Sequence, residues 1–149
     1  MEENFIMKKV EFLPALMSTN AMVDAQHKEL IEAINKLYAA IDEGKGVEEA
    51  QKTLEFLAQY TIFHFGGEEA LMQANQYPLF TEHKKAHDAF VVTVKGLFQV
   101  LTEKGATEEF GALVEKEVTA WLINHIQGMD IRMTDWIKIK SNGMMDNML

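Results

Sequence analysis

Residues 47–75 read VEEAQKTLEFLAQYTIFHFGGEEALMQAN and decide what kind of fold the chain adopts. Mostly apolar side chains recur there at alternating steps of three and four residues, which is typical of one face of an α-helix packed against other helices. The members of this face are Val47, Ala50, Leu54, Leu57, Thr61, His64, Glu68 and Leu71. The segment therefore predicts a long helix with one buried face.

Two ionisable residues interrupt this apolar face. His64 and Glu68 are four residues apart, which places their side chains about one turn apart on the same side of the helix. Burying such groups costs free energy unless each finds a partner. An imidazole and a carboxylate at this spacing can share a metal ion or a pair of metal ions. The rest of the chain must supply the other ligands.

The sequence on either side predicts three further long helices. Asn20 is expected to cap a helix over 21–43, Thr81 one that runs to 104, and Thr107 one that runs to about residue 127 or beyond. A short additional helix is expected over 131–140. Short turns join these segments, and no strand-like alternation or Gly-rich phosphate loop accompanies them. The fold expected for residues 20–140 is all-α, an up-down-up-down antiparallel four-helix bundle.

The two ends of the chain lack a sustained helical pattern. Residues 1–19 contain Pro14 and predict an extended N-terminal arm that packs on the bundle through Phe5, Ile6, Phe12 and Leu16. Residues 141–149 are Met-rich and predict a flexible C-terminal tail.

Length, charge and composition exclude several classes of protein. The 149 residues suffice for one domain, and a net charge of −9 argues against nucleic acid as a partner. Without cysteine there is no disulfide, Fe–S cluster or thiolate zinc site. No apolar run is long enough to cross a membrane, and the first residues do not resemble a signal peptide, so a cytoplasmic location is expected.

All five histidines fall on the apolar faces of the expected helices, and each helix contributes at least one. They are His27, His64, His83, His87 and His125. In an up-down bundle the start of helices one and three and the end of helices two and four share one end of the molecule. The five imidazoles and Glu68 therefore converge on one level of the interior, which predicts a metal site.

The ligand types favour two first-row transition-metal ions, with iron as the best fit. Five imidazoles with a carboxylate exceed what one tetrahedral zinc ion binds, and Ca²⁺ or Mg²⁺ prefers oxygen ligands. No histidine follows a Glu by three residues, which separates the chain from ferritin-like di-iron bundles. The pair His83 and His87 lacks the internal Glu of a zinc protease helix.

Asp130 is the candidate for a second bridging carboxylate. It follows His125 by five residues, which is about 140° around an ideal α-helix and therefore off the apolar face. The helix would have to end or deform between them, and Gly128 offers a place. Considered alone, the position of Asp130 favours a solvated carboxylate over a metal ligand.

Together these motifs resemble the hemerythrin family, in particular its bacterial single-domain members. The matching segments are Asp24-Ala25-Gln26-His27-Lys28-Glu29-Leu30, His64-Phe65-Gly66-Gly67-Glu68-Glu69-Ala70-Leu71-Met72, His83-Lys84-Lys85-Ala86-His87 and Trp121-Leu122-Ile123-Asn124-His125-Ile126, followed by Asp130. They span about residues 20–135, and their joint order and spacing are specific.

The resemblance implies a di-iron centre and a role for each ligand. One iron would be held by His83, His87 and His125. The other would be held by His27 and His64, with a position open for O₂. Glu68 and Asp130 would bridge the two non-heme irons together with an oxo or hydroxo group.

The neighbours of the expected ligands suggest a dry pocket. Phe65, Trp121 and Leu122 would line it, although an ordinary core role is equally compatible with their positions. Met133 stands where the family usually has an aromatic residue, and Met17-Ser18-Thr19-Asn20 departs from the usual run before the first ligand helix. The pair Gly66-Gly67 is expected to allow close approach of a neighbouring helix.

Three functions are compatible with such a centre. The first is reversible O₂ binding by a monomer for storage, delivery or sensing, with NO, azide or other small anions as further ligands. The second is a di-iron redox enzyme that reduces peroxide or nitric oxide or oxidises iron. The third is a signalling module that responds to O₂ or redox state.

Overall fold

The computed structural model describes the backbone of residues 7 and 9–148 and the side chains as far as residue 143. Within this part of the chain every regular element is a helix, and no strand occurs. The elements are η1 (Pro14–Leu16), α1 (Ala21–Asp42), α2 (Gly46–Ala74), α3 (Phe80–Lys104), α4 (Glu108–Val114), η2 (Glu115–Thr119), α5 (Ala120–His125), η3 (Ile126–Asp130) and α6 (Ile131–Met148). The prediction of an all-α fold is confirmed.

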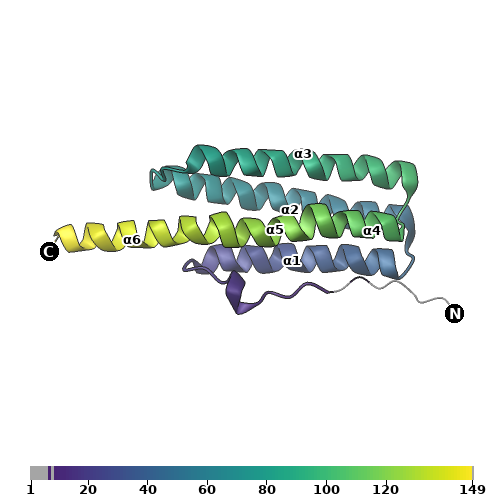
Figure 1. The fold of residues 1–149 in the computed structure, drawn as a ribbon, viewed down its shortest axis with the longest axis horizontal. Helices are drawn as coiled ribbons and strands as arrows, with labels where there is room; N and C mark the ends of the chain where they lie inside the picture. The colour runs from purple at the N-terminus through teal and green to yellow at the C-terminus, as the bar shows by residue number, and fades with distance from the viewer. Residues whose placement is uncertain (1–6, 8, 149) are drawn as a thin grey trace.

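Four long helical segments lie side by side, and α4 to α6 together make the fourth (Figure 1). α1 contacts α2, α2 contacts α3, and α4 contacts both α3 and α1, so the four segments enclose a common interior. In this view the connections from α1 to α2 and from α3 to α4 lie at one end of the bundle, and the connection from α2 to α3 lies at the other. The helix α6 continues beyond the other segments. No helix in the described residues has the length and hydropathy of a membrane span. The cytoplasmic location stays a prediction.

Local signals located two of the three predicted helix caps correctly. The side chain of Asn20 accepts a hydrogen bond from the Val23 N–H at 3.0 Å, and that of Thr107 accepts one from the Phe110 N–H at 3.0 Å. The predicted cap at Thr81 is wrong, because α3 already begins at Phe80. A turn in which the Phe80 N–H donates to the Tyr77 carbonyl starts the helix there.

The fourth segment is longer and less regular than predicted. α4 to α6 form one uninterrupted helix that contains two π-helical turns, η2 and η3. The expected separation between a helix ending near residue 127 and another starting at Ile131 is therefore wrong. The C-terminal end also differs, since α6 runs to Met148 where the sequence predicted no helix. Its flexibility stays a prediction.

Two apolar clusters lie on either side of one level in the bundle. The larger contains the apolar faces of α1 to α5, including Leu30, Phe65 and Ile126. The smaller one is formed by Val23, Met72, Tyr77 and Met133, against which Trp136 of α6 packs. The predicted metal ligands lie at this level. His27 follows Val23 of the smaller cluster by one helical turn, and Glu68 precedes Met72 of the same cluster by one turn. Solvent is thus kept from this level on both sides.

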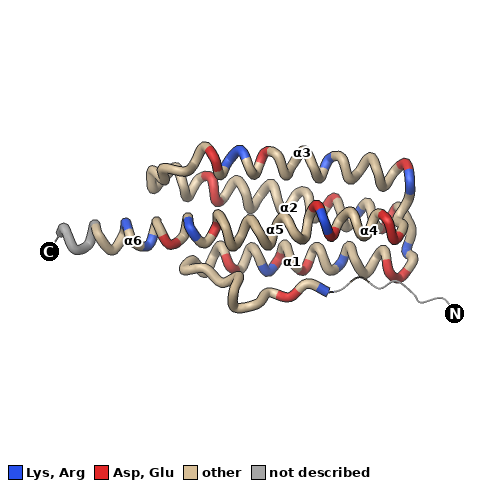
Figure 2. Tube along the Cα trace, viewed as in Figure 1, with Lys and Arg blue, Asp and Glu red and all other residues tan. Residues whose placement is uncertain are grey.

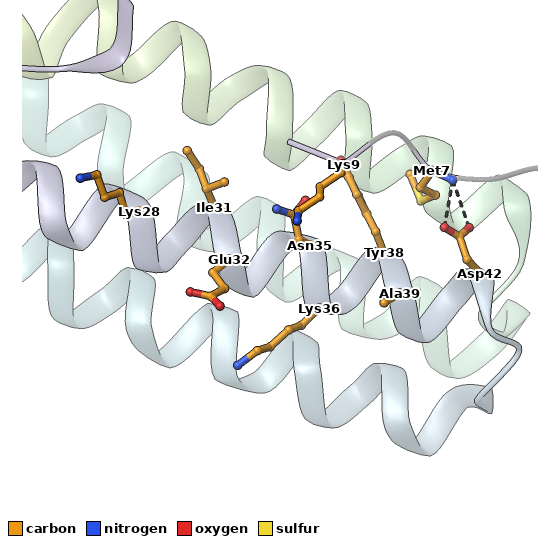
Figure 3. A pocket seen from close by; sticks show the side chains of 10 residues that line it. All are labelled: Met7, Lys9, Lys28, Ile31, Glu32, Asn35, Lys36, Tyr38, Ala39 and Asp42. Atoms are coloured by element: carbon orange, nitrogen blue, oxygen red, sulfur yellow. Dashed lines mark hydrogen bonds between the residues drawn. The ribbon is translucent and has the colours of Figure 1, made fainter. Parts of the chain in front are cut away.

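The described part of the N-terminal segment lies along α1. The backbone N–H of Met7 donates to both carboxylate oxygens of Asp42, at 3.1 and 3.0 Å (Figure 3). Further along, the Asn35 amide exchanges two hydrogen bonds with the backbone of Val10. A Cβ at Gly111 would lie 2.7 Å from the Met7 sulfur, so a larger residue there would require the Met7 side chain to shift.

The predicted packing residues of this segment can be placed in part. Leu16 is buried in the larger cluster, and Phe12 packs against it with the Lys28 ammonium 5.2 Å from the centre of its ring. Phe5 and Ile6 lie outside the described residues.

The glycine pair in α2 does not mark a close helix contact, so that expectation is wrong. A Cβ added at Gly66 would meet nothing within 4 Å, and one at Gly67 would reach only the Gln26 Oε1 atom, at 3.9 Å. Both glycines therefore cost helix stability without a packing reason.

Replacing Gly66 with alanine is expected to raise the free energy of unfolding by about 0.5–1 kcal/mol, because alanine loses less backbone entropy in a helix. Urea denaturation of the metal-free protein at low concentration measures this. Gly105→Ala is the contrasting variant, since Gly105 has a φ of +86° and alanine there should destabilise the protein. Equal effects of the two variants would contradict the argument.

Candidate metal centre

The structure brings all seven predicted ligand side chains together. They come from every long segment: His27 from α1, His64 and Glu68 from α2, His83 and His87 from α3, and His125 and Asp130 from the fourth. Each is at most 5% exposed. Burial of seven ionisable groups in one place requires a compensating interaction.

The ligand atoms fall into two groups that share both carboxylates. The first group is Glu68, His83, His87, His125 and Asp130, and the second is His27, His64, Glu68 and Asp130. Within each group the ligand atoms lie within 4.8 Å of one another. The arrangement therefore has three imidazoles on one side, two on the other, and two carboxylates between them.

Each carboxylate directs one oxygen toward each group. Glu68 Oε2 is 3.0 Å from His64 Nε2, whereas Oε1 is 3.1 Å from His87 Nε2. Asp130 Oδ2 is 2.9 Å from His27 Nε2, whereas Oδ1 is 3.1 Å from His125 Nε2. A carboxylate whose two oxygens face different ligand groups is suited to bridge two cations.

A π-helical turn explains how Asp130 reaches this position. η3 covers Ile126–Asp130, directly after His125, and its wider turn returns residue i+5 to the face of residue i. This confirms the prediction that the helix deforms between His125 and Asp130. Gly128 lies in the middle of the turn, and nothing is within 4 Å of where its Cβ would be.

Several short contacts do not have the geometry of hydrogen bonds. Six buried side-chain atoms have no hydrogen-bond partner in the described residues, namely His27 Nδ1 and Nε2, His64 Nε2, both Glu68 oxygens and Asp130 Oδ2. His27 Nε2 and Asp130 Oδ2 are only 2.9 Å apart, yet their angles do not suit a hydrogen bond. Atoms that converge in this way surround a common centre, as metal ligands do.

The donor set itself fits first-row metal ions. The Nε2 atom of His125 is 3.2 Å from that of His83 and 3.1 Å from that of His87. Imidazole lone pairs that face each other repel unless a proton or a cation lies between them. Imidazole nitrogen and carboxylate oxygen together suit iron and its neighbours better than Ca²⁺ or Mg²⁺.

Two residues outside the predicted ligand set orient the imidazoles. Gln26 Oε1 accepts a hydrogen bond from Nδ1 of His64 at 2.6 Å, and Glu69 Oε2 accepts one from Nδ1 of His87 at 2.9 Å. A proton on Nδ1 leaves the lone pair on Nε2, which faces the interior. In the sequence, only their positions next to His27 and Glu68 could have pointed to this role. Their contacts with His64 and His87 depend on how the neighbouring helices are rotated.

Aromatic rings cover the three-histidine side. Phe65 stacks on His87 with ring centroids 3.8 Å apart, and Trp121 stacks on His125 at 4.5 Å. Phe90, which the sequence did not single out, stacks on Trp121 at 4.1 Å. Leu122 is buried in the larger apolar cluster. Of the predicted pocket residues, Phe65 also lies near the other side, 6.0 Å from the His64 ring.

Charge balance in the metal-free cluster follows from its pKa shifts. Burial lowers the pKa of His27 and of His83, but the close carboxylates of Asp130 and Glu68 outweigh it and raise the pKa of each to about 9. Burial lowers the pKa of His125. Burial raises the pKa of the Glu68 and Asp130 carboxyls, but the close histidines outweigh it and lower both. Two imidazolium ions thus balance two carboxylates.

The metal-free protein is expected to lose stability as the pH rises from about 6.5 to about 9. The folded pKa of His27 and His83 is above the ordinary value of 6.5, so their contribution is full below pH 6.5 and disappears through about pH 9. The loss is on the order of 3 kcal/mol per histidine at most.

Urea denaturation at pH 6 and pH 9 after chelation measures this change. The carboxylates act in the opposite range, since their lowered pKa gives stability above the ordinary values, which is lost on acidification. Metal-loaded protein is the control and should vary less between pH 6 and 9, because the metal replaces the two protons. Equal stability of the metal-free protein at both pH values would contradict the proposed charge balance.

The amino-acid sequence is similar to a known protein family and to several of its members. The model of the family described as "Hemerythrin HHE cation binding domain" matches residues 18–137. A bacteriohemerythrin of Pseudomonas aeruginosa is 33% identical over 130 residues, which cover 82% of each chain. One of Methylococcus capsulatus is 34% identical over 109 residues, covering 72% of this chain and 79% of the relative. A hemerythrin of Phascolopsis gouldii is 30% identical over 119 residues, covering 80% and 85%.

Proposed function

The chain belongs to the hemerythrin family, and on that premise we propose that it binds O₂ reversibly at a non-heme di-iron centre, for oxygen storage, delivery or sensing. The observation that carries the proposal is the sharing of two buried carboxylates between a three-histidine group and a two-histidine group. We also propose that the bundle is up-down-up-down and that residues 1–19 form an arm on it.

The proposed ligand assignment follows the two groups. His83, His87 and His125 would hold one iron and His27 and His64 the other, with Glu68 and Asp130, which belong to both groups, shared between them beside an oxo or hydroxo group. Two ferrous ions would supply one electron each and a coordination position for O₂. Because the second group has two imidazoles instead of three, an iron held there would have room for a further ligand.

The protein's own residues provide what reversibility requires. The two apolar clusters keep water from the site, so water does not displace a bound ligand. Gln26 and Glu69 fix the protons of His64 and His87 on Nδ1, at the outer edge of each ring. No acidic proton is then directed from these two imidazoles toward the bound gas, which favours release over O–O cleavage.

An O₂ titration of the anaerobically iron-loaded protein tests the proposal. A visible absorption band should grow, saturate at about one O₂ per iron pair and disappear under vacuum. Rapid irreversible bleaching without such a band would overturn the proposal. Turnover of peroxide or nitric oxide with a reductant, at rates far above autoxidation, would instead identify a di-iron redox enzyme.

Replacing Gln26 with leucine is expected to weaken iron binding and O₂ affinity about 10–100-fold, because the Nδ1 proton of His64 loses its acceptor. Gln26→Glu should retain binding, since a carboxylate also accepts the bond. Iron retention against a chelator and the O₂ titration measure both effects. Gln73→Leu, at an exposed position of α2, is the matched control. Similar losses in all three variants would contradict the assigned role of Gln26.

A further inference from the structure

The outer face of α2 exposes several large apolar side chains close together. From Phe56 to Gly67 the chain has no charged residue, although a quarter of all its residues are charged. In Figure 2 the middle of α2 accordingly carries no red or blue. Phe56, Ile62 and Phe63 are 48%, 56% and 61% exposed there. Large apolar side chains exposed together mark an interaction surface more often than isolated ones do.

The metal centre and the bundle core do not explain this face. His64 and Thr61 of the same stretch point inward, whereas Phe56, Gln59, Ile62, Phe63 and Gly66 are exposed; we call these five residues the α2 face. The rings of Phe56, Tyr60 and Phe63 form a ladder with centroid separations of 6.2 and 5.7 Å. The first pair is stacked and the second is tilted. Contact between the rings limits their motion, so little side-chain entropy would be lost on binding.

A hollow beside the α2 face adds to the apolar surface. It lies between α2 and α3 and has a volume of about 220 Å³. Apolar residues that include Ile62, Val94 and Phe98 line it together with Glu55, Gln59, Thr61 and Lys95. A side chain from another molecule could enter it without leaving a polar group unpaired.

We propose that the α2 face binds the α2 face of a second copy of this chain, in an antiparallel, two-fold symmetric dimer. Two copies that each carry a net charge of −9 repel, and a symmetric interface places each surface opposite itself. An uncharged face is where such copies can meet without like charges opposing each other.

The order of residues along α2 suits this antiparallel pairing. A two-fold centre near residue 61 sets Phe56 against Gly66 of the second copy and Gln59 against Phe63. The space around Gly66, with nothing within 4 Å of a Cβ, can receive the Phe56 ring. Glu55 and Lys52, at one end, then face Gly67 and Ala70, so no two like charges of α2 itself meet. The monomer expected from the sequence stays a prediction, and the following experiment decides between it and the proposed dimer.

Sedimentation equilibrium of the full-length iron-loaded protein tests the dimer over a range of concentrations. The unmodified protein should dimerise in a concentration-dependent way. Phe63→Glu should raise the dissociation constant at least about 100-fold, because it places two carboxylates in an apolar interface. Ile139→Glu is the control, since Ile139 is 70% exposed on α6, and it should leave the dimer intact.

A single introduced cysteine gives an independent measurement, because the chain has none of its own. Ile62→Cys lies near the two-fold centre and should be joined into covalent dimers by a short thiol-reactive crosslinker, whereas Ile139→Cys should not. A monomer at every concentration, or crosslinking equal in both variants, would overturn the proposal. So would a monomer whose α2 face binds phosphatidylcholine vesicles, because a lipid surface would then be its partner.

Discussion

Replacing His64 with alanine is expected to abolish the O₂-dependent absorption band. His64 is one of only two imidazoles in the second ligand group, and its Nε2 atom lies 3.0 Å from Glu68 Oε2. Without it that group retains one imidazole and two shared carboxylates, too few for tight binding of a second iron. The three-histidine group is unchanged. Iron content should therefore fall from about two ions to about one, with O₂ uptake reduced at least about 100-fold.

The neighbouring residue provides a matched control. Phe63 is adjacent in sequence but exposed, so Phe63→Ala should keep both iron content and the absorption band. Circular dichroism of both variants establishes that the bundle still forms. A His64→Ala protein that binds two irons and retains the band would show that the ligand assignment is wrong.

Features that depend on nearby residues could be predicted from the sequence. Asn20 and Thr107 cap their helices because a cap is a contact across three residues. The inward side of α2, from Ala50 to Glu68, is buried as predicted. The helical period that predicts it can be read from α2 alone, without the neighbouring helices.

Features set by packing between distant residues could not be predicted. Thr81 has the side chain of a cap, but the turn at Tyr77 and Phe80 starts α3 earlier. Gly128 suggested that the helix ends or deforms, but the sequence did not decide between the two; the chain inserts a π turn there and the helix continues. Gln26 and Glu69 reach His64 and His87 across two helix interfaces, and the rotation of those helices is not written in either local sequence.

Removing the metal is expected to lower the melting temperature by about 15–30 °C. Each ion that binds only the folded chain adds about 4 kcal/mol when its concentration is a thousand times its dissociation constant. For a domain of this size each kcal/mol shifts the melting temperature by about 2–4 °C. The structural reason is the group of six buried side-chain atoms without hydrogen-bond partners in the described residues, which a cation would satisfy.

Calorimetry before and after chelation measures the shift, and adding metals back identifies its origin. Fe²⁺ should restore the melting temperature, and Zn²⁺ should restore part of it, because both accept imidazole nitrogen. Ca²⁺ should restore almost nothing, because it prefers oxygen ligands and the cluster has five imidazoles against two carboxylates. If Ca²⁺ stabilised the protein as much as Fe²⁺, the carboxylates alone would be binding the cation. The histidines would then be buried for packing, and a site for O₂ would have no basis.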